Sequence, residues 1–127
     1  MNLALWIAAG LLAVVALTGG VSKVFVPEEK LAAAPGGEWT AEAGRGFVKS
    51  LGAVELLAAA GLVLPALTGI APVLVPVTAA CWVLLMAGAM ITHVRHGSAN
   101  FVVLNLAYLA VAAFVAWGRF GPAAFTA

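Results

Sequence analysis

The residues with the clearest capacity for chemistry are a carboxylate, an ammonium and an imidazole within or at the ends of long apolar runs: Glu55, Lys23 and His93. Glu55 stands out, because it is the only one of the five acidic residues that lies inside such a run. A charge at the centre of a bilayer costs about 2.5–3.5 kcal/mol on insertion scales. The sequence therefore predicts that a buried partner, a ligand or a proton offsets the charge of Glu55.

Glu55, His93 and Lys23 are the candidate catalytic residues, since a carboxyl group, an imidazole and an amine can bind or move a proton beside a substrate. A structural role is the alternative, in which Glu55 ties helices together through Lys23, His93 or a hydroxyl group. Because Lys23 lies near the end of its apolar run, its ammonium can also extend to the membrane interface. The sequence does not choose between these roles.

The candidate ligand-binding residues lie on the third and fourth apolar runs. Asn105 and Tyr108 align on one helical face, and Met90 shares a face with His93. Trp82 is a further candidate, because an aromatic ring can stabilise a developing positive charge. The alternatives are helix–helix hydrogen bonding for Asn105 and simple packing for Met90.

Four apolar runs must position these side chains. Charged residues make up 9% of the chain, far below the roughly 25% of soluble domains. Each run reaches the roughly 20 residues that cross the hydrocarbon core of a bilayer as a helix. The predicted fold class is all-α, an integral membrane four-helix bundle, with residues 1–127 forming one transmembrane domain. Its spans are expected at about 3–25, 47–67, 72–93 and 99–118.

The one long connection, 26–46, joins the first two spans. Within it, the stretch 28–34 favours a short interfacial helix, and Trp39 suits the headgroup region. The connection either runs along the membrane surface or forms a lid over the mouth of the bundle.

Charge and composition exclude several classes of function. A net charge of +1 provides no basic patch for nucleic acid, and the single cysteine, Cys81, excludes an intrachain disulfide and a cysteine-based zinc finger. His93 and His96 lack the further ligands that a zinc site needs, so no metal is expected.

Polar side chains gather in one half of the predicted bundle. Small residues let membrane helices approach closely, so the small-residue faces that carry Lys23 and Glu55 are expected to point inward. Lys23, Glu55, His93 and Asn105 should then lie near one another.

The distribution of Lys and Arg predicts the orientation. Cytoplasmic loops carry an excess of these residues, and five of the six belong to the end with the first and third connections. Both termini are therefore predicted to lie outside the cytoplasm. The five are Lys23, Lys30, Arg45, Lys49 and Arg95, against Arg119 at the other end.

The chain resembles the DoxX-like family of small bacterial four-helix membrane proteins. The segments that carry the resemblance are 19–25 (GGVSKVF), 52–57 (GAVELL), 65–72 (PALTGIAP) and 91–93 (ITH). The similarity covers essentially the whole chain and implies a multi-pass protein of the bacterial inner membrane. Lys23, Glu55 and His93 match the recurring polar positions of the family.

Some relatives are membrane subunits of quinone-linked sulfur oxidation or partners of detoxifying enzymes. The resemblance thus implies a membrane subunit or binding protein for a lipophilic redox molecule such as a quinone, working with membrane lipid and a partner redox enzyme. A homo-oligomer is also compatible with the sequence. One alternative is a stand-alone enzyme that uses Glu55 for acid–base isomerisation or cyclisation of a lipophilic substrate. The other is a structural or assembly factor, in which Glu55 only locks helices together.

Overall fold

The computed structural model describes residues 1–125, and the elements in this range are all helices. Four of them are long and apolar enough to cross a membrane, which confirms the predicted all-α class. They are α1 (Asn2–Phe25), α4 (Arg45–Thr68), α5 (Leu74–Arg95) and α6 (Ala99–Phe120).

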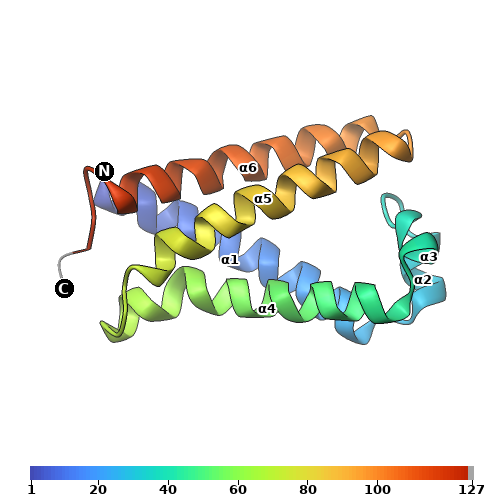
Figure 1. The fold of residues 1–127 in the computed structure, drawn as a ribbon, viewed down its shortest axis with the longest axis horizontal. Helices are drawn as coiled ribbons and strands as arrows, with labels where there is room; N and C mark the ends of the chain where they lie inside the picture. The colour runs from blue at the N-terminus through green and yellow to red at the C-terminus, as the bar shows by residue number, and fades with distance from the viewer. Residues whose placement is uncertain (126–127) are drawn as a thin grey trace.

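The long helices run alternately up and down, so each is antiparallel to the next (Figure 1). α1 packs closely against α4, and α5 packs closely against α6; α4 also contacts α5, and α1 also contacts α6. Two short helices, α2 (Glu28–Ala33) and α3 (Trp39–Ala43), lie at the same end as the α5–α6 turn. The N-terminus, residues 121–125 after α6 and the α4–α5 turn lie at the opposite end (Figure 1).

The helix boundaries differ slightly from the predicted spans. The third span begins at Leu74 instead of 72, because Gly69 and Ala71 turn the chain with positive φ angles of 73° and 48°. The predicted short helix in the long connection is α2, whereas α3 was not predicted.

Small residues form the inward faces of the first two spans, as predicted. Ala9, Ala16 and Gly20 of α1 are buried, and so are Gly52 and Leu62 of α4. The interior of the half near the α4–α5 turn is filled by apolar side chains, the largest of which are Leu5, Leu12, Leu62, Val75, Trp82 and Val115.

Large apolar side chains cover the outside of the bundle. Leu57 is 72% exposed, Leu84 74% and Val103 66%. A soluble monomer rarely exposes apolar surface on this scale, whereas lipid tails are as apolar as these side chains. The outer surface of the bundle is therefore a lipid-facing surface.

α1 and α4 touch through glycine backbone. A Cβ atom added to Gly52 would lie 2.8 Å from Lys23 Cβ, and one added to Gly20 would lie 2.8 Å from the Gly52 carbonyl oxygen. Nearby, the Lys49 ammonium donates a hydrogen bond to the Val24 carbonyl at 2.6 Å, which satisfies a free carbonyl at the end of α1. The helices are thus closest beside Lys23 and Glu55.

The close approach of α1 and α4 predicts a strong response to a larger side chain. Gly52→Leu should lower the free energy of unfolding by about 1–3 kcal/mol, because the added atoms overlap α1. Unfolding of the purified protein in one detergent, followed by circular dichroism, measures this change.

Gly10→Leu is the matched control, since a Cβ atom there meets no atom within 4 Å. It should leave the unfolding transition nearly unchanged. Equal stability of the two variants would contradict the tight contact.

Candidate functional site

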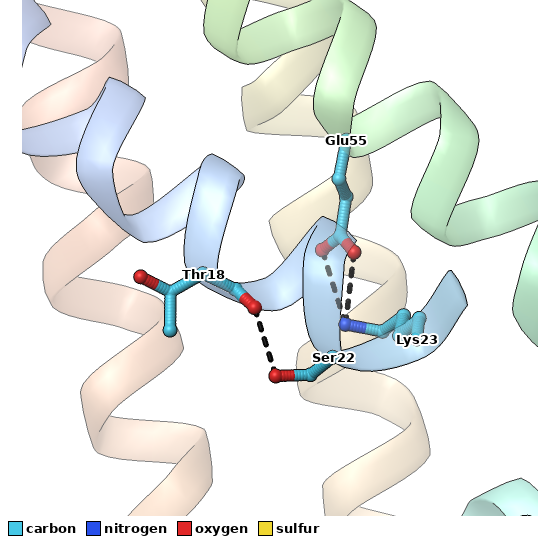
Figure 2. Close-up of polar contacts among 4 residues, drawn as sticks. All are labelled: Thr18, Ser22, Lys23 and Glu55. Atoms are coloured by element: carbon cyan, nitrogen blue, oxygen red, sulfur yellow. Dashed lines mark hydrogen bonds and ion pairs between the residues drawn. The ribbon is translucent and has the colours of Figure 1, made fainter. Parts of the chain in front are cut away.

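The buried carboxylate of Glu55 forms an ion pair with the ammonium of Lys23 (Figure 2). Lys23 Nζ lies 2.9 Å from Glu55 Oε2 and donates a hydrogen bond to Oε1 at 3.2 Å. The side chain of Glu55 is 8% exposed and that of Lys23 is 19% exposed. The ammonium of Lys23 is therefore turned toward Glu55, and this pair supplies the partner that the sequence required.

Gly19 leaves the space that the ion pair occupies. A Cβ atom at Gly19 would lie 3.3 Å from Glu55 Oε1 and 3.5 Å from Lys23 Nζ. The neighbouring hydroxyl group does not join the pair, because Ser22 donates its hydrogen bond to the Thr18 carbonyl at 2.8 Å (Figure 2). An ammonium has more N–H donors than the two carboxylate oxygens can occupy, so Lys23 retains capacity for a further acceptor.

A cavity of about 710 Å³ adjoins the ion pair. It lies between the long helices at the end that carries α3. Of its nineteen lining residues, eleven are apolar or glycine and eight carry a polar or charged side chain. Its lining includes Lys23, Trp39, Glu42, Phe47, Leu51, Glu55, Met86, Thr92, His93, His96, Phe101 and Asn105.

His93 is a second buried polar group on the cavity wall, with 8% of its surface exposed. Its imidazole stacks on the ring of Phe101, with the centroids 5.4 Å apart and the planes 24° from parallel. Among residues 1–125, Nδ1 of His93 has no hydrogen-bond partner. Buried polar atoms nearly always have such a partner, so this imidazole is a candidate for binding a ligand.

The segment between α1 and α4 covers the end of the cavity. Trp39 and Glu42 of α3 line it, and Glu42 Oε2 lies 3.2 Å from Nε2 of His96, at the end of α5. Nδ1 of His96 is 2.9 Å from the Thr92 carbonyl oxygen. These contacts agree better with a lid over the mouth of the bundle than with a connection that only runs along the membrane surface.

Gly36 helps to fix the position of this segment, residues 26–44, which we call the cover. Its φ angle of 79° is one that other residues rarely adopt, and a Cβ atom there would lie 2.6 Å from the Phe101 ring. Phe101 is thus held between the cover and His93.

The predicted site residues divide into two groups. The candidate catalytic residues Lys23, Glu55 and His93 all line the cavity, as does Asn105. The other three candidate ligand-binding residues do not. Trp82 is buried deeper in the core with 2% of its surface exposed, Tyr108 packs against that core, and Met90 is half-buried. Met86, which lies one helical turn before Met90 on α5, lines the cavity instead of Met90.

A buried cation that was not predicted lies at the opposite end of the bundle. Arg119 is 5% exposed, and its guanidinium carbon lies 3.9 Å from the centroid of the Phe125 ring. It also donates a hydrogen bond to the Ala123 carbonyl at 2.9 Å. Arg119 therefore anchors the chain after α6 and takes no part in the cavity.

The part of the chain that the structure describes contains no cluster of three or more His, Cys, Asp and Glu residues able to hold a metal ion. The polar side chains that line the cavity offer hydrogen-bond donors and acceptors.

Comparison with known families identifies the chain. The model of the DoxX-like family matches residues 7–115. The protein belongs to the DoxX-like family. The match includes the ion pair, His93, Asn105 and the segment that covers the cavity, and it stops before Arg119. Neither the curated proteins nor the solved structures that were compared gave a match. With its four apolar helices, this DoxX-like protein is a multi-pass membrane protein.

The buried ion pair of this DoxX-like protein should contribute strongly to stability. Glu55→Gln should lower the free energy of unfolding by about 3–5 kcal/mol, because it leaves a buried ammonium without its counter-charge. Unfolding in detergent measures the loss. Glu42→Gln is the control: the Glu42 side chain, which contacts His96, is 79% exposed, so loss of its charge should cost no more than about 1 kcal/mol.

A double variant tests whether the effect belongs to the pair. Lys23→Met combined with Glu55→Gln removes both charges and should recover part of the stability that Glu55→Gln loses. Additive losses in the double variant would contradict the coupling of the two side chains.

Proposed function

We propose that this DoxX-like protein is a small membrane subunit or binding protein for a lipophilic redox molecule such as a quinone. The observation that carries the proposal is a cavity in which apolar side chains lie beside a buried ion pair and a buried imidazole. Lys23, Glu55 and His93 come from three different helices and line the same space. In this role, they would bind the polar end of the ligand while the apolar wall receives its ring.

The size and lining of the cavity support a ligand of this class. Small-molecule sites are typically about 300–1,000 Å³ in volume and mostly apolar, with a few polar groups that fix orientation. The cavity has about 710 Å³, with Trp39, Leu51 and Met86 among its apolar residues. A quinone ring matches this environment, because its faces are apolar and its polar atoms are carbonyl oxygens.

The polar groups offer the donors that such a ligand needs. A quinone oxygen accepts hydrogen bonds, and both the Lys23 ammonium and the His93 imidazole can donate them. Glu55 would hold the ammonium in place and give the site a proton-accepting group beside it. Reduction of a quinone consumes electrons as well as protons. We assign the electrons to a partner redox enzyme, because a chain with one cysteine forms no dithiol within itself.

The ion pair favours this function over the stand-alone enzyme. Acid–base isomerisation would use Glu55 as a proton donor in apolar surroundings, whereas both of its oxygens lie within 3.2 Å of the Lys23 ammonium. The role of assembly factor is supported by the same ion pair, since it links α1 to α4. A ligand-binding measurement distinguishes the binding protein from the assembly factor, because only the binding protein requires a ligand.

Quinone binding predicts a specific effect of removing the imidazole nitrogens. His93→Phe retains a ring that can stack on Phe101, and it should weaken binding of a benzoquinone with a decyl chain about tenfold, the equivalent of roughly one hydrogen bond. Quenching of tryptophan fluorescence in lipid nanodiscs measures this affinity, because Trp39 lines the cavity.

Cys81→Ala is the matched control, since Cys81 is exposed on the lipid-facing surface. It should leave the affinity unchanged. If the unmodified protein does not bind the quinone, or if His93→Phe binds it equally well, the proposed function is wrong. Loss of stability without any change in binding in Glu55→Gln would favour the assembly factor.

We further propose that the protein lies in the bacterial inner membrane with both termini outside the cytoplasm. Lys30, Arg45, Lys49 and Arg95 gather at the end that carries α2 and α3. Arg119, the cation at the other end, is buried against Phe125. Exposed basic residues thus favour the α2–α3 end as the cytoplasmic side.

This orientation predicts the behaviour of reporters fused to the C-terminus. Alkaline phosphatase should be active in the bacterial host, because it folds only outside the cytoplasm, and a green fluorescent protein exported in the same position should remain dark. The reverse result would invert the topology.

A further inference from the structure

α4 and α5 pack tightly at one end and separate toward the other. Near their shared turn, a Cβ atom added to Gly61 would lie 2.5 Å from Thr78 Oγ1. From there the two helices diverge toward α3 (Figure 1). The cavity lies in the divergent half, between residues such as Leu51 of α4 and Ala89 of α5.

The rim of the cavity between α4 and α5 is apolar and belongs to the lipid-facing surface. Phe47 is 59% exposed and Leu84 is 74% exposed, and both line the cavity. Gly88, one turn along from Leu84, also lines it, and a Cβ atom there meets no atom within 4 Å. Residues that are both lining and exposed mark an opening, so the cavity opens sideways between these two helices.

The route from the aqueous end of the bundle is different. Glu42 of α3 contacts His96 at the end of α5, and Gly36 packs against Phe101. These contacts connect the cover to α5 and α6 across the end of the cavity. Glu42 and Arg95 line the cavity here and are exposed, so this end has an opening too, but its rim is polar, with His96 beside them. An apolar chain is therefore better accommodated at the apolar rim between α4 and α5.

We infer that the ligand enters sideways from the bilayer between α4 and α5, and that it is a single-chain amphiphile with a compact polar head that accepts hydrogen bonds. The head would meet Lys23 and His93 inside, and the chain would pass over Gly88 into the surrounding lipid. This inference rests on the proposed function and deepens it, because it assigns the ligand class by its chain as well as by its head.

An aromatic side chain at the rim should block this passage. Gly88→Trp should weaken binding of a benzoquinone with a decyl chain at least about tenfold. The same ring without the chain should bind with an affinity within about twofold of that of the unmodified protein. Both affinities are measured by fluorescence quenching in lipid nanodiscs, with the unmodified protein alongside.

Gly10→Trp is the matched control, because Gly10 has equally open space around it and lies outside the cavity lining. It should bind both probes as the unmodified protein does. Leu84→Trp is a second variant at the same rim, at a position where the native side chain is already exposed, and it should act in the same direction as Gly88→Trp. An unfolding transition measured without either probe shows that each variant is folded.

The outcomes separate this inference from the proposed function. If the decyl probe binds the unmodified protein and both rim variants equally well, sideways access is wrong and quinone binding stands. If the rim variants weaken both probes to the same degree, the chain does not pass over Gly88, which also overturns the inference. If neither probe binds the unmodified protein, the proposed function fails and the inference fails with it.

Discussion

The placement of a carboxylate within a membrane-spanning helix is the constraint on which the rest of this structure depends. The cost of that charge requires a counter-charge nearby, and Lys23 provides it from α1 at 2.9 Å. For the two side chains to meet, α1 and α4 must approach until backbone touches backbone. Gly19, Gly20 and Gly52 allow this approach, because larger side chains would overlap the pair or the facing helix.

The tight contacts are distributed unevenly along the bundle, and this distribution creates the cavity. α4 meets α5 closely at Gly61 and Thr78, and α1 meets α6 closely at Leu5 and Gly118, both in the half near the α4–α5 turn. In the other half, α1 and α4 stay together while α4 and α5 separate (Figure 1). Close packing fills the first half with apolar side chains, whereas the second half holds a cavity beside the ion pair.

The lining of the cavity differs from that of a packing defect. A packing defect in an apolar core is lined by apolar groups, but this cavity borders a buried ion pair and an imidazole with an unpartnered nitrogen. It also has a cover: α3 contacts His96, and Gly36 contacts Phe101. Polar groups at the inner wall and apolar residues at the lipid-facing rim suit a ligand that has both a polar and an apolar part.

The sequence by itself determined the membrane class, the four spans and the inward faces of α1 and α4. Length and hydropathy decide these properties, because the bilayer requires about 20 apolar residues per helix and small residues mark close contacts. Only the tertiary structure decided that Lys23 pairs with Glu55, that α3 covers the cavity, and that Trp82, Tyr108 and Met90 lie outside its lining. Helical spacing gives the direction of a side chain around its own axis. Packing sets the tilt and separation of neighbouring helices. These in turn decide whether the side chain reaches a cavity, the core or lipid.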